Sequence, residues 1–324
     1  MIDDLPPDLI TTEFDGSSTA TQVVSGLDLS GLRAVVTGGG AGIGLATTRA
    51  LVAAGAQVTI AARSTAAATE AARTQVTGPG TVDVAPLDLA DTASVARFAD
   101  AWVGPLHLLV NNAGIVTAGL ERTPEGWELQ LATNHLGHFG LTTRLHAALL
   151  AGADDRHGAR VVNVGSTALM RADVDLDDLQ FERRPYDPQI AYAQSKTANS
   201  LFSVEASRRW APDGIVCNTV NPGGVATGLQ RHFTPEQKRS LDAAEAAGVF
   251  AYKTIEQGAA TTIVAATWPA FAGSGGHYLD DGQEAYPVPN DAGLADHPHG
   301  VKEWALDPVA AGRLWDVSAD LVGR

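Results

Sequence analysis

The sequence holds a single cysteine, Cys217, in 324 residues. One cysteine excludes an intramolecular disulfide and is typical of a protein from a reducing compartment. It lies in the apolar segment 214–220, which predicts a small buried strand residue rather than a nucleophile. Basic residues are also few: 22 Lys and Arg face 37 Asp and Glu, which gives a net charge of −15. This acidic balance argues against nucleic acid or an anionic membrane surface as the partner, and we interpret it as a source of solubility.

Long apolar runs are missing as well. None approaches the roughly 18 residues that are needed to cross a bilayer. The first 25 residues are acidic and polar, without the basic region and apolar core of a signal peptide. The last four residues carry no lipidation signal. We therefore expect a soluble, cytoplasmic protein, and its 45% hydrophobic content is enough for a large core.

Short apolar runs alternate with helical stretches from Leu32 onward. Candidate strands lie at 32–37, 57–62, 81–87, 106–111, 159–165, 214–220 and 276–279. Candidate helices lie at 42–54, 65–75, 91–102, 124–150, 190–211, 254–268 and 308–322. This alternation predicts a single α/β domain over 28–324: a doubly wound parallel sheet of about seven strands, with helices on both faces. Residues 1–27 contain Pro6-Pro7 and a Gly-Ser-Ser-Thr cluster, which predict a poorly ordered or loosely docked arm.

A glycine-rich turn separates the first strand from the first helix. Residues 37–44 run Thr-Gly-Gly-Gly-Ala-Gly-Ile-Gly. A strand, such a turn and a helix N-terminus form an anion site, because backbone N–H groups and the helix dipole point at a bound phosphate. Gly44 would lack the Cβ that otherwise holds helix and strand apart. An ordinary βα turn is the alternative, but the context favours a pyrophosphate and hence a Rossmann-type fold.

Further motifs follow the later strands. In chain order they are Asp88, Asn111-Asn112-Ala113-Gly114, Asn134, Ser166, Tyr192-x-x-x-Lys196 and Asn221-Pro222-Gly223. Together with Thr-Gly-x-x-x-Gly-x-Gly, this ordered set resembles the short-chain dehydrogenase/reductase family over roughly residues 30 to 280. The segment 192–202 and the long spacing from Ser166 to Tyr192 are similar to the retinol-dehydrogenase-like branch. The resemblance also implies a mobile substrate lid around 223–250.

Tyr192 and Lys196 are four residues apart in a predicted helix, so their side chains lie on one face. A phenol with a pKa near 10 is a poor base at neutral pH. A nearby ammonium group favours the phenolate, as does the positive charge of an oxidised nicotinamide. We therefore expect the pKa of Tyr192 to be lowered. From these two residues alone, a surface Tyr–Lys pair is the alternative.

The family resemblance assigns a role to each catalytic candidate. Tyr192 would be the general acid/base, and Lys196 would lower its pKa and hold the nicotinamide ribose. Ser166 would polarise the carbonyl, and Asn134 would hold a water that links Lys196 to solvent. Read from the residues, Ser166 could instead cap its connection, with Thr167 as the donor. Asn134 is a mediocre helix former, which suggests a kink or a water site, with a structural asparagine as the alternative.

The resemblance also implies the cofactor contacts. They are Gly38, Gly40, Gly42, Ile43, Gly44, Arg63, Ser64, Asp88, Leu89, Asn112, Ala113, Gly114, Tyr192, Lys196, Pro222, Gly223, Val225 and Thr227. Asp88 and Leu89 would contact the adenine, through the carboxylate and the backbone N–H respectively. Asn111, Ala113 and Gly114 would form the floor beneath the riboses. The Val225 backbone and the Thr227 hydroxyl would bind the carboxamide and the pyrophosphate.

Cofactor choice depends on the end of the second strand. An NAD site usually has a carboxylate there to accept the ribose 2′-hydroxyl. This chain has Ala62 at that place, followed by Arg63 and Ser64. Arg63 offers a planar cation with several donors, which suits a 2′-phosphate. We therefore predict NADP(H), with acceptance of NAD(H) as the alternative.

No metal site is expected. His135 and His138 have no carboxylate or cysteine partner at ligand spacing, and the histidines of the 296–299 loop are equally weak evidence. The sequence thus predicts an oxidoreductase that interconverts an alcohol and an aldehyde or ketone, on an apolar small molecule. A non-catalytic dinucleotide sensor, a double-bond reductase, and a nucleotide-sugar dehydratase or epimerase are the alternatives. Relatives often form dimers or tetramers through the helices equivalent to 124–150 and 190–211. A homodimer or homotetramer is therefore the hypothesis here, with a surface blocked or reshaped by the insertion after Ser166 and the C-terminal tail as the alternative.

Overall fold

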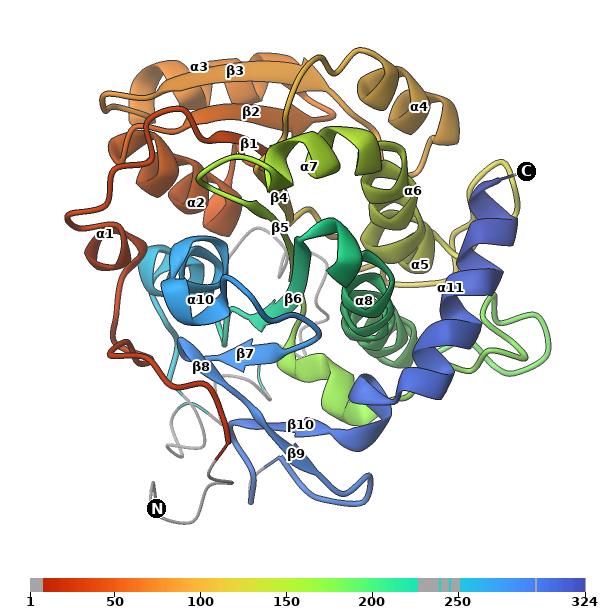
Figure 1. Ribbon diagram of the computed structural model, residues 1–324. Helices are drawn as coiled ribbons and strands as arrows, with labels where there is room; N and C mark the ends of the chain where they lie inside the picture. The colour runs from red at the N-terminus through yellow and green to blue at the C-terminus, as the bar shows by residue number, and fades with distance from the viewer. Residues whose placement is uncertain (1–7, 227–238, 240–244, 246–250, 295, 324) are drawn as a thin grey trace.

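The structure is a computed structural model that describes residues 8–226, 239, 245, 251–294 and 296–323. Its centre is an eight-stranded sheet in the order β3-β2-β1-β4-β5-β6-β7-β8 (Figure 1). The strands are β1 (Arg33–Thr37), β2 (Gln57–Ala62), β3 (Thr81–Pro86), β4 (Leu108–Asn111), β5 (Ala159–Val164), β6 (Ile215–Asn221), β7 (Tyr278–Asp280) and β8 (Gln283–Glu284). The first seven are parallel, as predicted, and β8 pairs antiparallel with β7.

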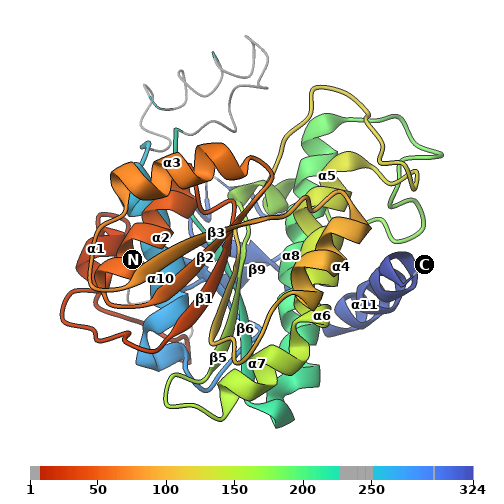
Figure 2. The same ribbon diagram turned by 90° about the horizontal axis from the view of Figure 1, so that it is seen from above.

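Helices cover both faces of the sheet (Figure 2). One layer holds α1 (Ala20–Val23), α2 (Gly42–Ala53), α3 (Thr65–Gln75) and α10 (Ile255–Thr267). The other holds α4 (Thr92–Asp100), α5 (Leu129–Leu131), α6 (Gly137–Arg144), α7 (His146–Ala153) and α8 (Pro188–Trp210). Side chains alternate along each strand, so Val36 lies in the core under α2 and α10, whereas Val35 lies in the core under α4 and α6. The predicted doubly wound architecture is confirmed.

The single helix predicted over 124–150 is instead broken. It consists of α5, a π-helical turn (Ala132–Leu136), α6 and α7, with a further break at Leu145. Single π turns inside helices often occur at functional sites. Asn134 lies within this turn, in agreement with the irregularity that its poor helix propensity suggested.

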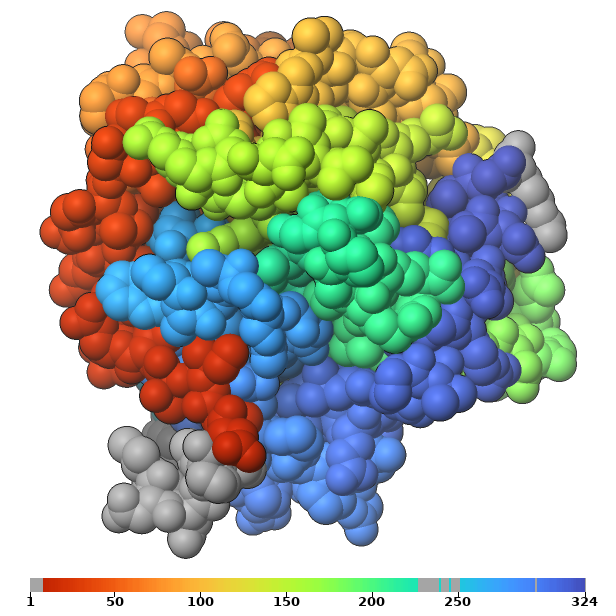
Figure 3. Space-filling view, in the orientation of Figure 1, coloured from red at the N-terminus to blue at the C-terminus, as the bar shows by residue number. Residues whose placement is uncertain are grey.

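The N-terminal segment is docked more firmly than the sequence predicted. Ala20 and Val23 of α1 are buried against α10, and Thr19 caps α1 in a capping box with Gln22. Ahead of α1, Thr12 exchanges hydrogen bonds with Gln283 of β8. Figure 3 shows this red segment lying against the blue surface of the residues after 250. The capping-box pattern Thr19-x-x-Gln22 is the feature of the sequence that indicates an ordered helix here.

The C-terminal residues add elements outside the minimal sheet. β9 (Tyr286–Val288) and β10 (Gly300–Lys302) form a separate parallel pair that the sequence did not predict. Helix α11 (Pro308–Val322) packs on α8 and α6, where Trp315 stacks edge-on against Phe139 and Trp210. Helix α11 thus covers part of the surface that α6 and α8 would otherwise offer to a second copy. Within the described ranges, no helix is both long and apolar enough to cross a membrane.

Candidate active site

The predicted site residues gather at the carboxyl ends of the parallel strands, where ligands bind in open α/β sheets. The glycine turn follows β1, Asp88 follows β3, and Ser166 follows β5. The motifs that follow β4 and β6 complete the same edge. The topology therefore brings together segments that lie more than 100 residues apart in the chain.

The glycine turn leaves no room for side chains. Gly38 and Gly42 have φ of +66° and +50°, which side chains rarely adopt. A Cβ on Gly44 would lie 2.5 Å from both the Gly38 carbonyl oxygen and Asn112 Nδ2. Helix α2 begins at Gly42, and Ala41 at its N-cap offers no side-chain acceptor. The first N–H groups of α2 are thus without a side-chain cap, as an anion site requires.

Replacing Gly44 by alanine is expected to weaken cofactor binding and to destabilise the fold by about 1–3 kcal/mol, because backbone opposes the added methyl group. The measurement is NADPH titration by fluorescence, together with thermal unfolding. Gly273 is the matched control, since a Cβ there meets nothing within 4 Å. Unchanged NADPH affinity in Gly44→Ala would contradict the assignment of this turn to the pyrophosphate.

Thr37 fixes the segment after β4 against the glycine turn. Its hydroxyl accepts from the N–H groups of Asn112 and Ala113 at 2.9 and 3.0 Å. Asn112 Nδ2 in turn donates to the Thr37 carbonyl oxygen at 2.7 Å. The side chain of Asn111 instead points into the core and donates to Asn163 Oδ1. The expectation that Asn111 forms part of the ribose floor is therefore wrong for its side chain, which ties β4 to β5.

The end of β2 and the start of α3 lie next to the glycine turn. A Cβ on Gly40 would come within 2.8 Å of the Ala68 Cβ in the first turns of α3. Arg63 and Ser64 are exposed, and Ser64 at the N-cap makes no side-chain capping bond. Both side chains are thus exposed to solvent at the place where the sequence predicts the 2′-position of the cofactor ribose.

The adenine candidates Asp88 and Leu89 follow β3. Asp88 Oδ1 accepts from the Ala90 N–H at 3.0 Å, and the Asp88 side chain is partly exposed. Leu89 is buried against α6, where Gly137 has no Cβ and so lets the Leu89 carbonyl approach closely. Their placement at the sheet edge agrees with the prediction, while their contact with adenine stays a prediction.

The loop after β6 meets the start of α2. Val225 and Ile43 both lie against Gly258 of α10, so the loop and the glycine turn share one wall. Gly223, which follows Pro222, has a φ of +77°. Thr227 and most of the predicted lid lie outside the described residues.

Tyr192, Lys196 and Ser166 come together as the sequence predicts. The Ser166 hydroxyl lies near enough to the Tyr192 phenol to lower the pKa of the phenol. Lys196 Nζ lies 5.7 Å from the Tyr192 ring centroid and donates to the Val164 carbonyl oxygen at 2.8 Å. The alternative donor, Thr167, has its hydroxyl bound to Asn221 Nδ2 at 2.8 Å. Ser166 Oγ accepts from the Ala168 N–H at 3.1 Å, so it caps its connection as the alternative expected, while its O–H remains able to donate to a substrate.

The protonation of the pair differs from the expectation. Burial raises the pKa of Tyr192 to about 12, although the hydrogen bond from Ser166 acts in the opposite direction. Burial also lowers the pKa of Lys196 to about 8. Without a cofactor the pKa of Tyr192 is therefore raised and not lowered, because desolvation outweighs a cation that bonds to the backbone rather than to the phenol. The lowering expected from an oxidised nicotinamide stays a prediction. At neutral pH Tyr192 is a protonated acid.

Asn134 is held by the backbone of the segment after β4. Its Oδ1 accepts from the Ile115 N–H at 2.8 Å, and its Nδ2 donates to the Ile115 carbonyl at 3.1 Å. A Cβ on Gly114 would lie 3.4 Å from Asn134 Oδ1 and 3.6 Å from Lys196 Nζ. Asn134 Oδ1 and Lys196 Nζ thus both lie beside Gly114, and the water that would link them stays a prediction.

His135 and His138, which were considered as metal ligands from the sequence, are hydrogen-bonded to other parts of the fold. His138 joins the Asn134 carbonyl oxygen to the Thr37 hydroxyl, at 2.9 and 2.8 Å. His135 bonds to Ser318 of α11 at 2.9 Å. Burial lowers the pKa of His138 to about 3, so this link stays neutral. Sequence spacing gave no sign that His138 connects Thr37, at the start of the glycine turn, to the π-helical turn that carries Asn134.

Comparison with known proteins identifies the family. Residues 33–238 match the family model described as short chain dehydrogenase. The chain is a short-chain dehydrogenase/reductase. It is 49% identical over 301 residues to a "Probable oxidoreductase" of Streptomyces antibioticus, covering 91% of this chain and 98% of the relative.

Two further relatives of this dehydrogenase/reductase carry more specific names. Mouse polyprenol dehydrogenase is 40% identical over 266 residues, covering 79% of this chain and 77% of its own. A solved structure of the Pseudomonas aeruginosa RhlG/NADP active-site complex has a TM-score of 0.65 and 31% identity, over 79% of this chain and 96% of its own. The predicted family, fold and oxidoreductase class are confirmed.

Proposed function

We propose that this protein is an NADP(H)-dependent reductase that converts an apolar aldehyde or ketone to the alcohol, with Tyr192 as the general acid. The observation that carries the proposal is the grouping of Tyr192, Ser166 and buried Lys196 at the same sheet edge as the glycine turn. A pair of donors beside a dinucleotide cradle suits a carbonyl oxygen that gains charge during reduction. The geometry favours an enzyme over a non-catalytic sensor, because all three groups are present and lie close together.

The residues fit a nicotinamide cofactor, because the cradle at Gly38 and Gly44 excludes side chains and leaves α2 with an uncapped N-terminus. The bound cofactor supplies the hydride for the carbonyl carbon. Ser166 Oγ–H donates to the carbonyl oxygen and polarises it. Tyr192 gives its phenolic proton to the same oxygen as negative charge develops there. Lys196 keeps a positive charge nearby and so stabilises the resulting phenolate.

The protonation state of Tyr192 suits the proposed reduction. A phenol with a pKa of about 12 carries its proton at neutral pH, which is the state that donates to a carbonyl oxygen. Oxidation of an alcohol requires the phenolate instead, and the positive nicotinamide ring would favour that form. The protonated phenol is thus the form that the proposed reduction uses.

Preference for NADP(H) is supported by exposed Arg63 at the end of β2, where Ala62 replaces the acid of NAD sites. Charge reversal in Arg63→Glu is expected to weaken NADPH binding roughly 10²-fold, because a charged hydrogen bond is worth about 1.5–3 kcal/mol and repulsion is added. NADH binding should change little. Arg313→Glu, on exposed α11, controls for the change in net charge. An equal loss of affinity for NADPH and NADH would contradict the assignment of Arg63 to the 2′-phosphate.

An apolar substrate is supported by the resemblance to the retinol-dehydrogenase-like branch and by the name of the mouse relative, a polyprenol dehydrogenase. The test is NADPH oxidation against aldehydes and ketones of increasing chain length, with short polar carbonyls for comparison. We expect kcat/KM to rise with apolar length. Preference for the polar carbonyls would contradict the apolar assignment and leave the reaction class intact. The single cysteine supports a reducing compartment such as the cytoplasm.

A further inference from the structure

One side-chain amide joins the two loops that flank the predicted nicotinamide position. Asn221 Oδ1 accepts from the N–H groups of Thr167 and Gly223 at 3.1 and 3.2 Å. Asn221 Nδ2 donates to Thr167 Oγ1 at 2.8 Å. Thr167 directly follows Ser166, and Gly223 belongs to the predicted cofactor loop. The spacing between the serine hydroxyl and that loop therefore depends on how this amide is held.

The nitrogen end of the Asn221 amide needs a second acceptor, because it carries two N–H groups and the Thr167 hydroxyl takes only one. Asp280 at the end of β7 supplies it: its Oδ1 accepts from Asn221 Nδ2 at 3.0 Å. A carboxylate accepts hydrogen bonds and cannot donate them, so it fixes which end of the amide faces it. Asp280 is only 7% exposed, so water does not readily replace this bond.

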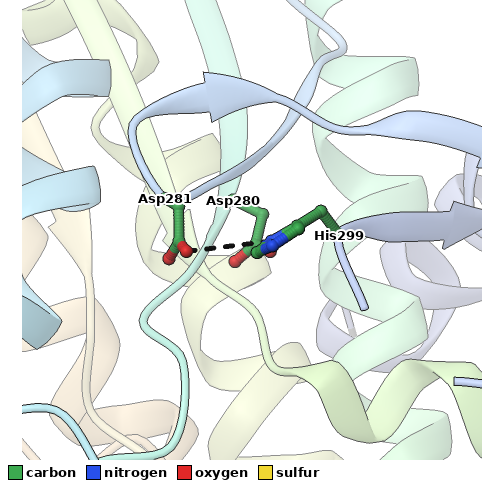
Figure 4. A group of neighbouring side chains, drawn as sticks. All are labelled: Asp280, Asp281 and His299. Atoms are coloured by element: carbon green, nitrogen blue, oxygen red, sulfur yellow. Dashed lines mark hydrogen bonds and ion pairs between the residues drawn. The ribbon is translucent and has the colours of Figure 1, made fainter. Parts of the chain in front are cut away.

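Asp280 is itself held in place by a histidine (Figure 4). His299 Nδ1 bonds to the second carboxylate oxygen of Asp280 at 2.7 Å, and this contact raises the pKa of His299. One possible metal-ligand atom from each of Asp280, Asp281 and His299 lies within 4.8 Å of the other two, a spacing that could hold a cation. Lys253 already forms an ion pair with Asp281. We therefore interpret this cluster as a charge-balanced support rather than a metal site.

We propose that Asp280 is a positioning residue for carbonyl reduction, acting through Asn221 on the Ser166–Thr167 segment and the Pro222–Gly223 loop. The inference rests on the proposed function. Asp280 is hydrogen-bonded to Asn221 and His299 and not to Tyr192 or Ser166. It supports the Asn221 amide in the orientation that satisfies both loops. Without Asp280 one N–H of the amide loses its acceptor, so the amide shifts and the serine hydroxyl moves relative to the cofactor loop.

The test compares steady-state NADPH-dependent carbonyl reduction by the full-length wild type and its variants. Asp280→Ala is expected to lower kcat about 10²-fold, the cost of a displacement of roughly 1 Å in a reacting pair, with a smaller rise in KM for NADPH. Asp280→Asn keeps an acceptor oxygen and should recover to within about tenfold of the wild type. The double variant Asn221→Ala/Asp280→Ala should be no slower than Asn221→Ala alone, because the two residues act in series.

A loss of stability alone must be told apart from a loss of positioning. Asp307→Ala is the matched control, because Asp307 caps α11 through the Val309 N–H and has no contact with Asn221. It should lower Tm and leave kcat unchanged. The positioning proposal is overturned if the losses in kcat are additive in the double variant, or if kcat is unchanged in Asp280→Ala. In either case carbonyl turnover by the wild type leaves the proposed function standing. Absence of carbonyl turnover in the wild type overturns both.

Discussion

Replacing Tyr192 by phenylalanine is expected to lower kcat for carbonyl reduction about 10³-fold, within the range for loss of a general acid. The substitution removes one oxygen and keeps the ring, so the packing of α8 and the binding of NADPH should survive. Ser166 can still polarise the carbonyl, but no group remains to deliver a proton. The measurement is NADPH oxidation at 340 nm with a long-chain aldehyde, with NADPH affinity followed by fluorescence.

Tyr286→Phe is the control for this variant, since Tyr286 lies on β9 and is no part of the proposed site. It should retain full activity. If Tyr192→Phe kept more than about a tenth of the wild-type kcat, Tyr192 would not be the acid, and another donor would have to be sought. A loss of NADPH binding in Tyr192→Phe would point to a structural effect instead.

Lys196→Met is expected to lower kcat by about 10²-fold or more and to change the dependence on pH. Lys196 has a pKa of about 8, so its charge is present below that pH and is lost above it. Tyr192, with a pKa of about 12, keeps its proton throughout this range. Reduction by the wild type should therefore fall as pH rises through about 8. The variant lacks this titration, so its low rate should be flat there.

Arginine at the same position separates charge from shape. Lys196→Arg carries a charge that is not lost below pH 12. It should restore part of the rate and remove the fall near pH 8, although the planar fork fits the Val164 carbonyl less well. An unchanged alkaline fall in Lys196→Met would contradict the assignment of that titration to Lys196.

Strong local patterns explain how much of the fold could be predicted. Apolar runs bounded by glycine located the seven parallel strands to within a few residues, because buried strands read as continuous apolar segments. The site candidates followed from the same alternation, since parallel strands place their carboxyl ends at one edge. Arg63 and the Tyr192–Lys196 pair could be chosen as site candidates because their residue types are informative without any contact being known.

The rest depended on long-range contacts. Asn111 and Asn112 are identical in sequence type, but only the structure shows that one points into the core and the other toward the glycine turn. The pKa of Tyr192 was predicted from its neighbour four residues away, whereas burial, a property of the whole fold, decides it. Asp280 lies 59 residues from Asn221, and no spacing in the sequence linked them.

The most direct test follows the hydride itself, using NADPH that carries two deuterium atoms at nicotinamide C4 and an apolar unsaturated ketone. Mass spectrometry of the product locates the transferred deuterium. The account predicts one deuterium on the carbinol carbon of the alcohol, formed by the wild type and not by Tyr192→Phe. Deuterium on a carbon of the former double bond would make the protein a double-bond reductase. Tight NADPH binding with no transfer to any carbonyl would contradict the enzymatic account and favour a dinucleotide sensor.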